Sequence, residues 1–125
     1  MDRRTLLKTL MVASLLPSST NAKGNNMGLS KFGFIVTGSN LNPDINRISM
    51  KSDRFEMIAV GVSEASEGVA VAVEMVAEGI QLIELCGGFG PVWTGRVIDA
   101  ISGAVPVGSV GYGPESVDQM YHLFK

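Results

Sequence analysis

Four short apolar runs, each bounded by turn residues, alternate along this chain with segments that have helical spacing. The runs cover residues 31–37, 55–62, 80–85 and 105–110, and they contain many β-branched and aromatic side chains. Such runs indicate β-strands, and strands that alternate with helices form parallel βαβ units with right-handed crossovers. The pattern therefore predicts an α/β fold, a small single-domain sandwich with a mostly parallel four-stranded sheet.

Four segments have the spacing or the cap residues of helices: residues 42–50, 64–78, 91–102 and 114–124. The second of these is the clearest, because its apolar side chains recur three and four residues apart. Ser63 is its candidate N-cap and Gly79 its candidate end. Asn42 followed by Pro43 has the order of a cap and a first helical residue, which predicts a short helix over the first segment.

A flavodoxin-like strand order, 2-1-3-4, is one arrangement that these elements allow. In such sheets, ligands bind outside the carboxyl ends of the strands, at the point where the strand order reverses. That point would lie between the first and third strands, and it would bring residues 38–42 beside residues 86–91.

The amino-terminal residues have the pattern of a bacterial export signal. Arg3 and Arg4 precede a modest apolar run and then small residues up to Ala22, which resembles a twin-arginine signal peptide. We therefore expect a signal peptide over residues 1–22, a linker over 23–30 and one α/β domain over 31–125, with a periplasmic or exported location. The apolar run is far shorter than the roughly 20 residues that span a bilayer, so no stable membrane span is expected.

Composition excludes several classes of partner. Removal of residues 1–22 would leave seven basic and eleven acidic residues, a net charge of −4, with no basic stripe to neutralise phosphates. Nucleic acid is therefore not an expected partner. Single Cys and His residues, Cys86 and His122, exclude an internal disulfide and indicate no metal site. A small domain with 46% hydrophobic residues is, however, a candidate for burying surface in a homo-oligomer.

A glycine-rich segment follows the third predicted strand and precedes a predicted helix. Backbone amides at a helix entrance can hold an anion, so residues 86–90 predict a site for a small anionic or polar metabolite. The segment lacks the Gly-Lys-Ser/Thr of a P-loop, and Trp93 occupies the place of the last glycine in Gly-x-Gly-x-x-Gly. The candidate ligand-binding residues are Glu84, Cys86, Gly87, Gly88, Phe89, Gly90, Arg47 and Arg96. A tight structural turn is the alternative interpretation of the glycines.

Glu84 and Cys86 are the candidate catalytic residues. They are two positions apart on a strand, so their side chains are expected on the same face. Glu84 would then act as a general base or Cys86 as a nucleophile. The alternative for Cys86 is a small buried hydrophobe, which is how free cysteines usually behave. An acid in an apolar strand needs a partner, and Arg47 and Arg96 are the candidate counter-charges.

The segment from residue 31 to about residue 110 resembles a bacterial and archaeal family, the domain of unknown function number 6506. The resemblance is carried by Glu84-Leu-Cys-Gly-Gly-Phe-Gly90, by Val76-Ala-Glu-Gly79 before it and by Thr94 and Arg96 after it. Asn42-Pro-Asp44 with Arg47 adds a weaker match. The resemblance implies an α/β fold and a pocket near the glycines, but no activity and no cofactor.

Three functions remain open on the sequence. The first is an exported domain that binds a small anionic or polar ligand after the third strand. The second is a small enzyme that uses Glu84 or Cys86. The third is a structural or homo-oligomeric interaction protein, in which the glycine turn is a packing device.

Overall fold

The computed structural model describes residues 28–125, so the predicted signal peptide lies outside the described residues. Five strands form one sheet with the order β2-β3-β1-β4-β5. All neighbouring pairs are parallel except β2 and β3, which are antiparallel. The strands are β1 (Lys31–Thr37), β2 (Arg47–Lys51), β3 (Glu56–Val62), β4 (Leu82–Leu85) and β5 (Val107–Ser109). The helices are α2 (Gly68–Ala77), α3 (Gly90–Ala100) and α4 (Val117–Phe124), each preceded by a short 3-10 turn: Ala65–Glu67, Gly87–Phe89 and Pro114–Ser116.

The α/β class is confirmed and each of the four predicted strands forms, but the sheet has five strands instead of the predicted four, because β2 adds to its edge. Without β2, the observed order is that of the flavodoxin-like arrangement 2-1-3-4. The predicted helix over residues 42–50 is wrong, because only one turn forms there before β2 begins. Asn42 makes that turn by accepting hydrogen bonds from the backbone N–H groups of Ile45 and Asn46, at 3.1 and 2.7 Å.

The side chains after this turn explain why a strand follows it. Ile48 and Met50 alternate with polar residues, which is the two-residue period of a strand rather than the period of a helix. The N–H of Gly61 then donates to the carbonyl of Asn46 at 2.8 Å and places β2 along β3. The sheet therefore gains an antiparallel edge strand where a crossover helix was expected.

The helix between β3 and β4 begins and ends close to the predicted positions. Gly79 ends it with a φ of 90°, a conformation that suits glycine. Ser63 is not its N-cap, because the Ser63 hydroxyl donates to the carbonyl of Leu41 at 2.6 Å. The first turn is closed instead by Glu67, whose carboxylate accepts from the N–H of Glu64 at 3.1 Å.

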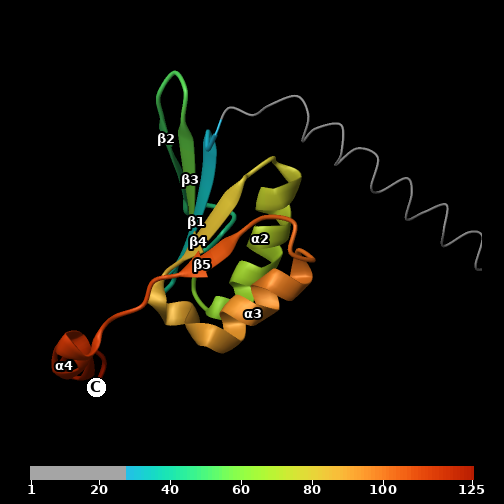
Figure 1. Cartoon of the computed structure of the whole chain (residues 1–125). Helices are drawn as coiled ribbons and strands as arrows, with labels where there is room; N and C mark the ends of the chain where they lie inside the picture. Colours follow the sequence, from blue (N-terminus) through green and yellow to red (C-terminus); the bar gives the residue numbers. More distant parts are fainter. Residues whose placement is uncertain (1–27) are drawn as a thin grey trace, which may run out of the picture.

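Helices α2 and α3 lie side by side on one face of the sheet, and the hydrophobic core lies between them and the strands (Figure 1). Close approach of α2 depends on Gly33 of β1, since a Cβ atom there would come within 2.7 Å of the Met75 sulfur. The core is formed by Ile35, Ile58, Val60, Val62, Val71, Ala72, Met75, Ile80, Ile83, Leu85, Phe89, Val97 and Ile101. Within residues 28–125, no helix has the length and apolar character needed to cross a membrane.

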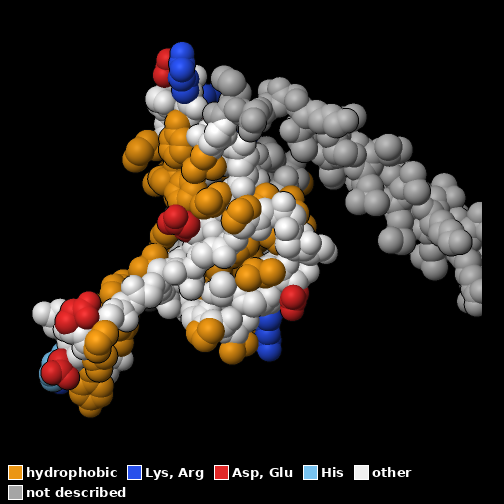
Figure 2. All heavy atoms as spheres, viewed as in Figure 1, with side chains coloured by type: hydrophobic (Ala, Val, Ile, Leu, Met, Phe, Trp, Pro, Cys, Tyr) orange, Lys and Arg blue, Asp and Glu red, His pale blue; other side chains and the backbone are white. Residues whose placement is uncertain are grey.

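Within residues 28–125, no helix lies on the opposite face of the sheet (Figure 1). Because side chains alternate along each strand, the register assigns ten residues of β1 to β4 to it. We call this surface the bare face; its residues are Phe32, Phe34, Val36, Ile48, Met50, Met57, Ala59, Gly61, Leu82 and Glu84. Hydrophobic side chains gather over the strands in the space-filling view (Figure 2).

The C-terminal helix stands clear of the rest of the domain (Figure 1). None of the α4 residues is buried. Val117, Tyr121, Leu123 and Phe124 are each at least 60% exposed, which is unusual for four large apolar side chains on one short helix.

Candidate functional site

The predicted site lies where β4 ends and α3 begins. We call residues 87–90 the glycine turn. Phe89 is buried in this turn and lies against Gly68, the first residue of α2. Gly90 has a φ of 62° and turns the chain into α3, with Pro91 in the first helical turn. The turn is therefore anchored to the core by Phe89 and redirected by Gly90.

Cys86 joins the carboxyl ends of β1 and β4. Its Sγ accepts a hydrogen bond from the backbone N–H of Thr37 at 3.2 Å, and it lies 3.3 Å from the Thr37 hydroxyl. The side chain is half-buried and packs against the core. Sequence analysis missed Thr37, although its place at the end of the first strand is a signal that could have found it.

Two glycines of the turn allow close packing. A Cβ atom on Gly88 would collide with the Thr37 hydroxyl, and one on Gly87 would come within 3.1 Å of the Tyr112 ring. The first hydrogen bond of the turn runs from the N–H of Phe89 to the carbonyl of Cys86 at 3.1 Å. The amides of Gly87 and Gly88 precede it, at the exposed entrance to α3.

Glu84 lies on the bare face, between Phe34 of β1 and Gly108 of β5 in the register. It is exposed, and no helix of the described part of the chain covers that face. This position explains how an acid can occupy an apolar strand of a mostly parallel sheet: water reaches the carboxylate. The structure thus brings Cys86, Gly88 and Thr37 together and places Glu84 on the open side of the sheet.

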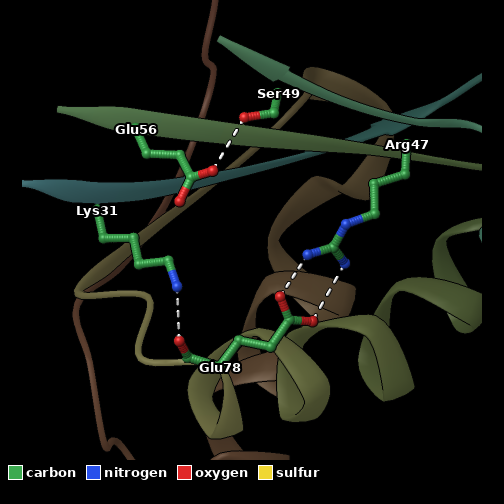
Figure 3. A network of polar contacts seen from close by, with 5 residues as sticks. All are labelled: Lys31, Arg47, Ser49, Glu56 and Glu78. Atoms are coloured by element: carbon green, nitrogen blue, oxygen red, sulfur yellow. Dashed lines mark hydrogen bonds and ion pairs between the residues drawn. The ribbon is translucent and has the colours of Figure 1, made fainter. Parts of the chain in front are cut away.

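The two arginines have partners other than Glu84. The two terminal guanidinium nitrogens of Arg47 donate to the two carboxylate oxygens of Glu78 at the end of α2, one of them at 3.1 Å (Figure 3). The hydrogen bond to Glu78 raises the pKa of Arg47, and the same bond lowers the pKa of Glu78. The guanidinium of Arg96 lies 4.4 Å from the centre of the Trp93 ring, a cation–π contact.

A polar network surrounds this ion pair on the helix side of the sheet. Lys31 Nζ donates to the Glu78 carbonyl at 2.8 Å, and the Ser49 hydroxyl donates to Glu56 at 3.0 Å (Figure 3). These contacts tie β1 to the end of α2 and tie β2 to β3. Arg47 is therefore part of a structural network that fixes the edge strand.

A cavity of about 280 Å³ opens on the bare face, away from the glycine turn. Leu41 forms one wall and lies over Gly61, where a Cβ atom would come within 2.8 Å of Leu41 Cδ1. Residues 38–42 thus turn toward β3, whereas the sequence placed them beside residues 86–91. The cavity is lined by Val36, Leu41, Ile45, Asn46, Arg47, Ile48, Ala59 and Gly61.

A family model for proteins of unknown function, DUF6506, matches residues 30–125. The chain belongs to the DUF6506 family. The resemblance carried by residues 84–90 is thereby confirmed, and the match extends through α4 to the last residue. No curated protein and no solved structure matches this DUF6506 chain. In residues 28–125 of this DUF6506 protein, no group of three or more His, Cys, Asp or Glu side chains is placed to hold a metal ion.

Proposed function

We propose that this DUF6506 domain is a homo-oligomeric interaction protein whose interface is the bare face of its sheet. One observation carries the proposal: α2 and α3 cover the same side, and the opposite side is apolar apart from Glu84. Sheets whose strands are mainly parallel are normally covered on both faces. A second copy supplies the missing cover without any further segment of this chain.

The exposure of the edge strand supports this proposal. Ile48 and Met50 of β2 are 66% and 65% exposed, and Ile45 beside them is 76% exposed. The stacked rings of Phe32 and Phe55, with centroids 6.5 Å apart, extend the surface across β1. Full burial of one such side chain contributes about 1.5–3 kcal/mol, whereas association itself costs about 4–15 kcal/mol, so many of these side chains must be buried together for micromolar association.

Substitution on β2 tests the proposal. In Met50→Asp, a charge would have to be buried in the interface, so the variant should be monomeric at concentrations where the parent associates. Val92→Asp is the matched control, because Val92 is 63% exposed on α3, away from the bare face. Sedimentation velocity of the three proteins gives the answer. A parent that stays monomeric at high micromolar concentration would contradict the proposal.

A small anionic or polar ligand at the glycine turn is the second candidate function. The exposed amides of Gly87 and Gly88 at the entrance to α3 favour it, with Cys86, Glu84 and Arg96 as neighbours along the chain. Thermal unfolding with inorganic phosphate and with small dicarboxylates tests it. Binding at 100 times the Kd stabilises the fold by about 2.7 kcal/mol, and no shift with any anion would count against the site.

Catalysis by Glu84 or Cys86 has less support. The hydrogen-bond partners of Cys86 Sγ in residues 28–125 are the amide and hydroxyl of Thr37, and neither of these is a general base. The reactivity of the Cys86 thiol in the folded protein tests this function.

Export remains a further proposal, supported by the sequence of residues 1–22. A twin-arginine signal would carry the domain across the membrane already folded. The expected location is the periplasm or outside the cell.

A further inference from the structure

The C-terminal helix has the pattern of a segment that binds in an apolar groove. Val117, Met120, Tyr121 and Phe124 recur at positions i, i+3, i+4 and i+7, which places them on one side of α4. We call these four residues the apolar stripe. Asp118, Gln119 and His122 lie on the other side of the helix. Val117, Tyr121 and Phe124 of the stripe are exposed and Met120 is half-buried, so most of this apolar surface is in contact with water.

The chain before α4 leaves the domain in a direction set by two contacts. The N–H of Val110 donates to the carbonyl of Leu85 at 3.0 Å, which continues the pairing of β5 with β4. The Tyr112 ring then lies against Gly87. These contacts carry α4 beyond the carboxyl ends of the strands, where it stands clear of its own domain (Figure 1). In this position the stripe is open to a second copy of the chain.

We propose that α4 of each copy lies on the bare face of the other in a two-fold dimer, with its apolar stripe over the cavity lined by Ile48 and Leu41. This inference rests on the proposed interface and names what fills it. The cavity provides a pocket into which an aromatic side chain of the stripe can insert, as buried aromatic anchors do at interfaces. With two-fold symmetry each copy gives its α4 to the other, so the assembly stops at two copies.

The area that such an exchange buries agrees with that of a stable dimer. Tyr121 and Phe124 are 67% and 74% exposed. An aromatic side chain buries about 150–250 Å² in full, so these two bury roughly 200–350 Å² per helix. With two helices and a matching area on each sheet, the aromatic residues alone account for about 800–1,400 Å² of the roughly 1,200–2,000 Å² in a standard interface. Val117 and Met120 of the stripe add to this.

Two variants of the full chain and their mixture test the inference. Phe124→Asp places a charge in the apolar stripe and leaves the bare face unchanged. Ile48→Asp places a charge on the bare face and leaves the stripe unchanged. Each should weaken self-association at least tenfold in sedimentation equilibrium. Gln119→Asp, on the polar side of α4, should associate as the parent does. An equimolar mixture of the first two variants should form a heterodimer, because one intact helix still meets one intact face.

The outcomes separate this inference from the proposed interface. If Ile48→Asp is monomeric while Phe124→Asp and Tyr121→Asp associate like the parent, the bare face is an interface but α4 does not fill it. If Phe124→Asp and Ile48→Asp are each monomeric and their mixture also stays monomeric, the exchange of α4 between copies is overturned. A parent that is monomeric throughout contradicts the interface itself. Circular dichroism of each variant shows that the fold is retained.

Discussion

Thr37 and Cys86 link the carboxyl ends of two neighbouring parallel strands. The backbone N–H of Thr37 donates to the Cys86 sulfur at 3.2 Å, and the Thr37 hydroxyl lies 3.3 Å from the same atom. The thiol therefore accepts a hydrogen bond that completes the end of β1, and it packs against the core. This contact makes Cys86, the residue before the glycine turn, part of the packing at the end of β1.

Substitution of Cys86 should lower stability to an extent that depends on the hydrogen bond. Cys86→Ala leaves the half-buried amide of Thr37 without its acceptor, which costs about 1–3 kcal/mol in the free energy of unfolding. Cys86→Ser keeps an acceptor at this place and should lose less. Urea denaturation of the two variants measures the difference. Equal losses would show that packing alone accounts for the effect.

The reactivity of the same thiol tests the catalytic alternative. Because Cys86 is half-buried and hydrogen-bonded, iodoacetamide should modify it slowly in the folded protein and rapidly in urea. Rates measured across pH report the thiolate. Native Cys86 that reacts as fast as an unfolded cysteine, or faster, would restore the nucleophile as a serious candidate.

Two glycine substitutions should change stability in opposite directions. Gly88→Ala forces a methyl group against the Thr37 hydroxyl, and strain of this kind costs about 1–3 kcal/mol. Gly95→Ala is the matched control, because Gly95 lies inside α3 with no atom within 4 Å of the added Cβ. It should stabilise the protein by about 0.5–1 kcal/mol through helix propensity. Thermal unfolding compares them, and equal shifts would contradict close packing at Gly88.

The Arg47–Glu78 pair should contribute little stability, with a defined pH dependence. Its side chains are 41% and 35% exposed, so Glu78→Gln should cost about 0.2–1 kcal/mol at neutral pH, and less at high salt. The hydrogen bond from Arg47 lowers the pKa of Glu78 from its ordinary 4.5. The contribution is therefore full above pH 4.5 and is lost as the pH falls through the lowered pKa. Urea unfolding of both proteins from pH 7 to pH 3 should show their stabilities converging; a constant difference would contradict this.

Export by a twin-arginine route should depend on both arginines of the signal. Replacement of Arg3 and Arg4 by lysine keeps the charge but removes the pair that defines the motif. The variant should therefore accumulate inside bacterial cells, whereas the parent is found in the periplasmic fraction. Lys8→Arg serves as the control. Equal fractionation of all three would reject this route.

The sequence predicted the elements that repeat a strong local pattern and missed those that depend on tertiary contacts. Residues 64–78 show their helical period directly, and the four predicted strands lie in short apolar runs. Residues 42–50 were misassigned because a cap followed by proline starts a single turn as well as a helix. The hydrogen bond from Gly61 to Asn46 favours the single turn followed by a strand over the helix. That contact joins residues far apart in the sequence, so the local pattern could not predict it.

The candidate site was predicted in its position but not in its partners. The glycine turn lies where the sequence placed it, at the entrance to α3. Glu84 was expected in a pocket because parallel strands are usually buried, yet the missing crossover helix leaves it exposed. The pairing of Arg47 with Glu78 depends on the edge strand β2, which the sequence analysis did not find.

The mass of the protein in solution decides whether the bare face is an interface between two copies of the chain. Sedimentation equilibrium of the full chain over a wide range of concentrations should give twice the chain mass of 13.2 kDa. The Met50→Asp variant should give the mass of one chain. Loss of the dimer on substitution at the bare face, but not at Val92, is the predicted result. A parent at 13.2 kDa throughout the range, or a dimer unaffected by Met50→Asp, would show that the bare face is not a dimer interface.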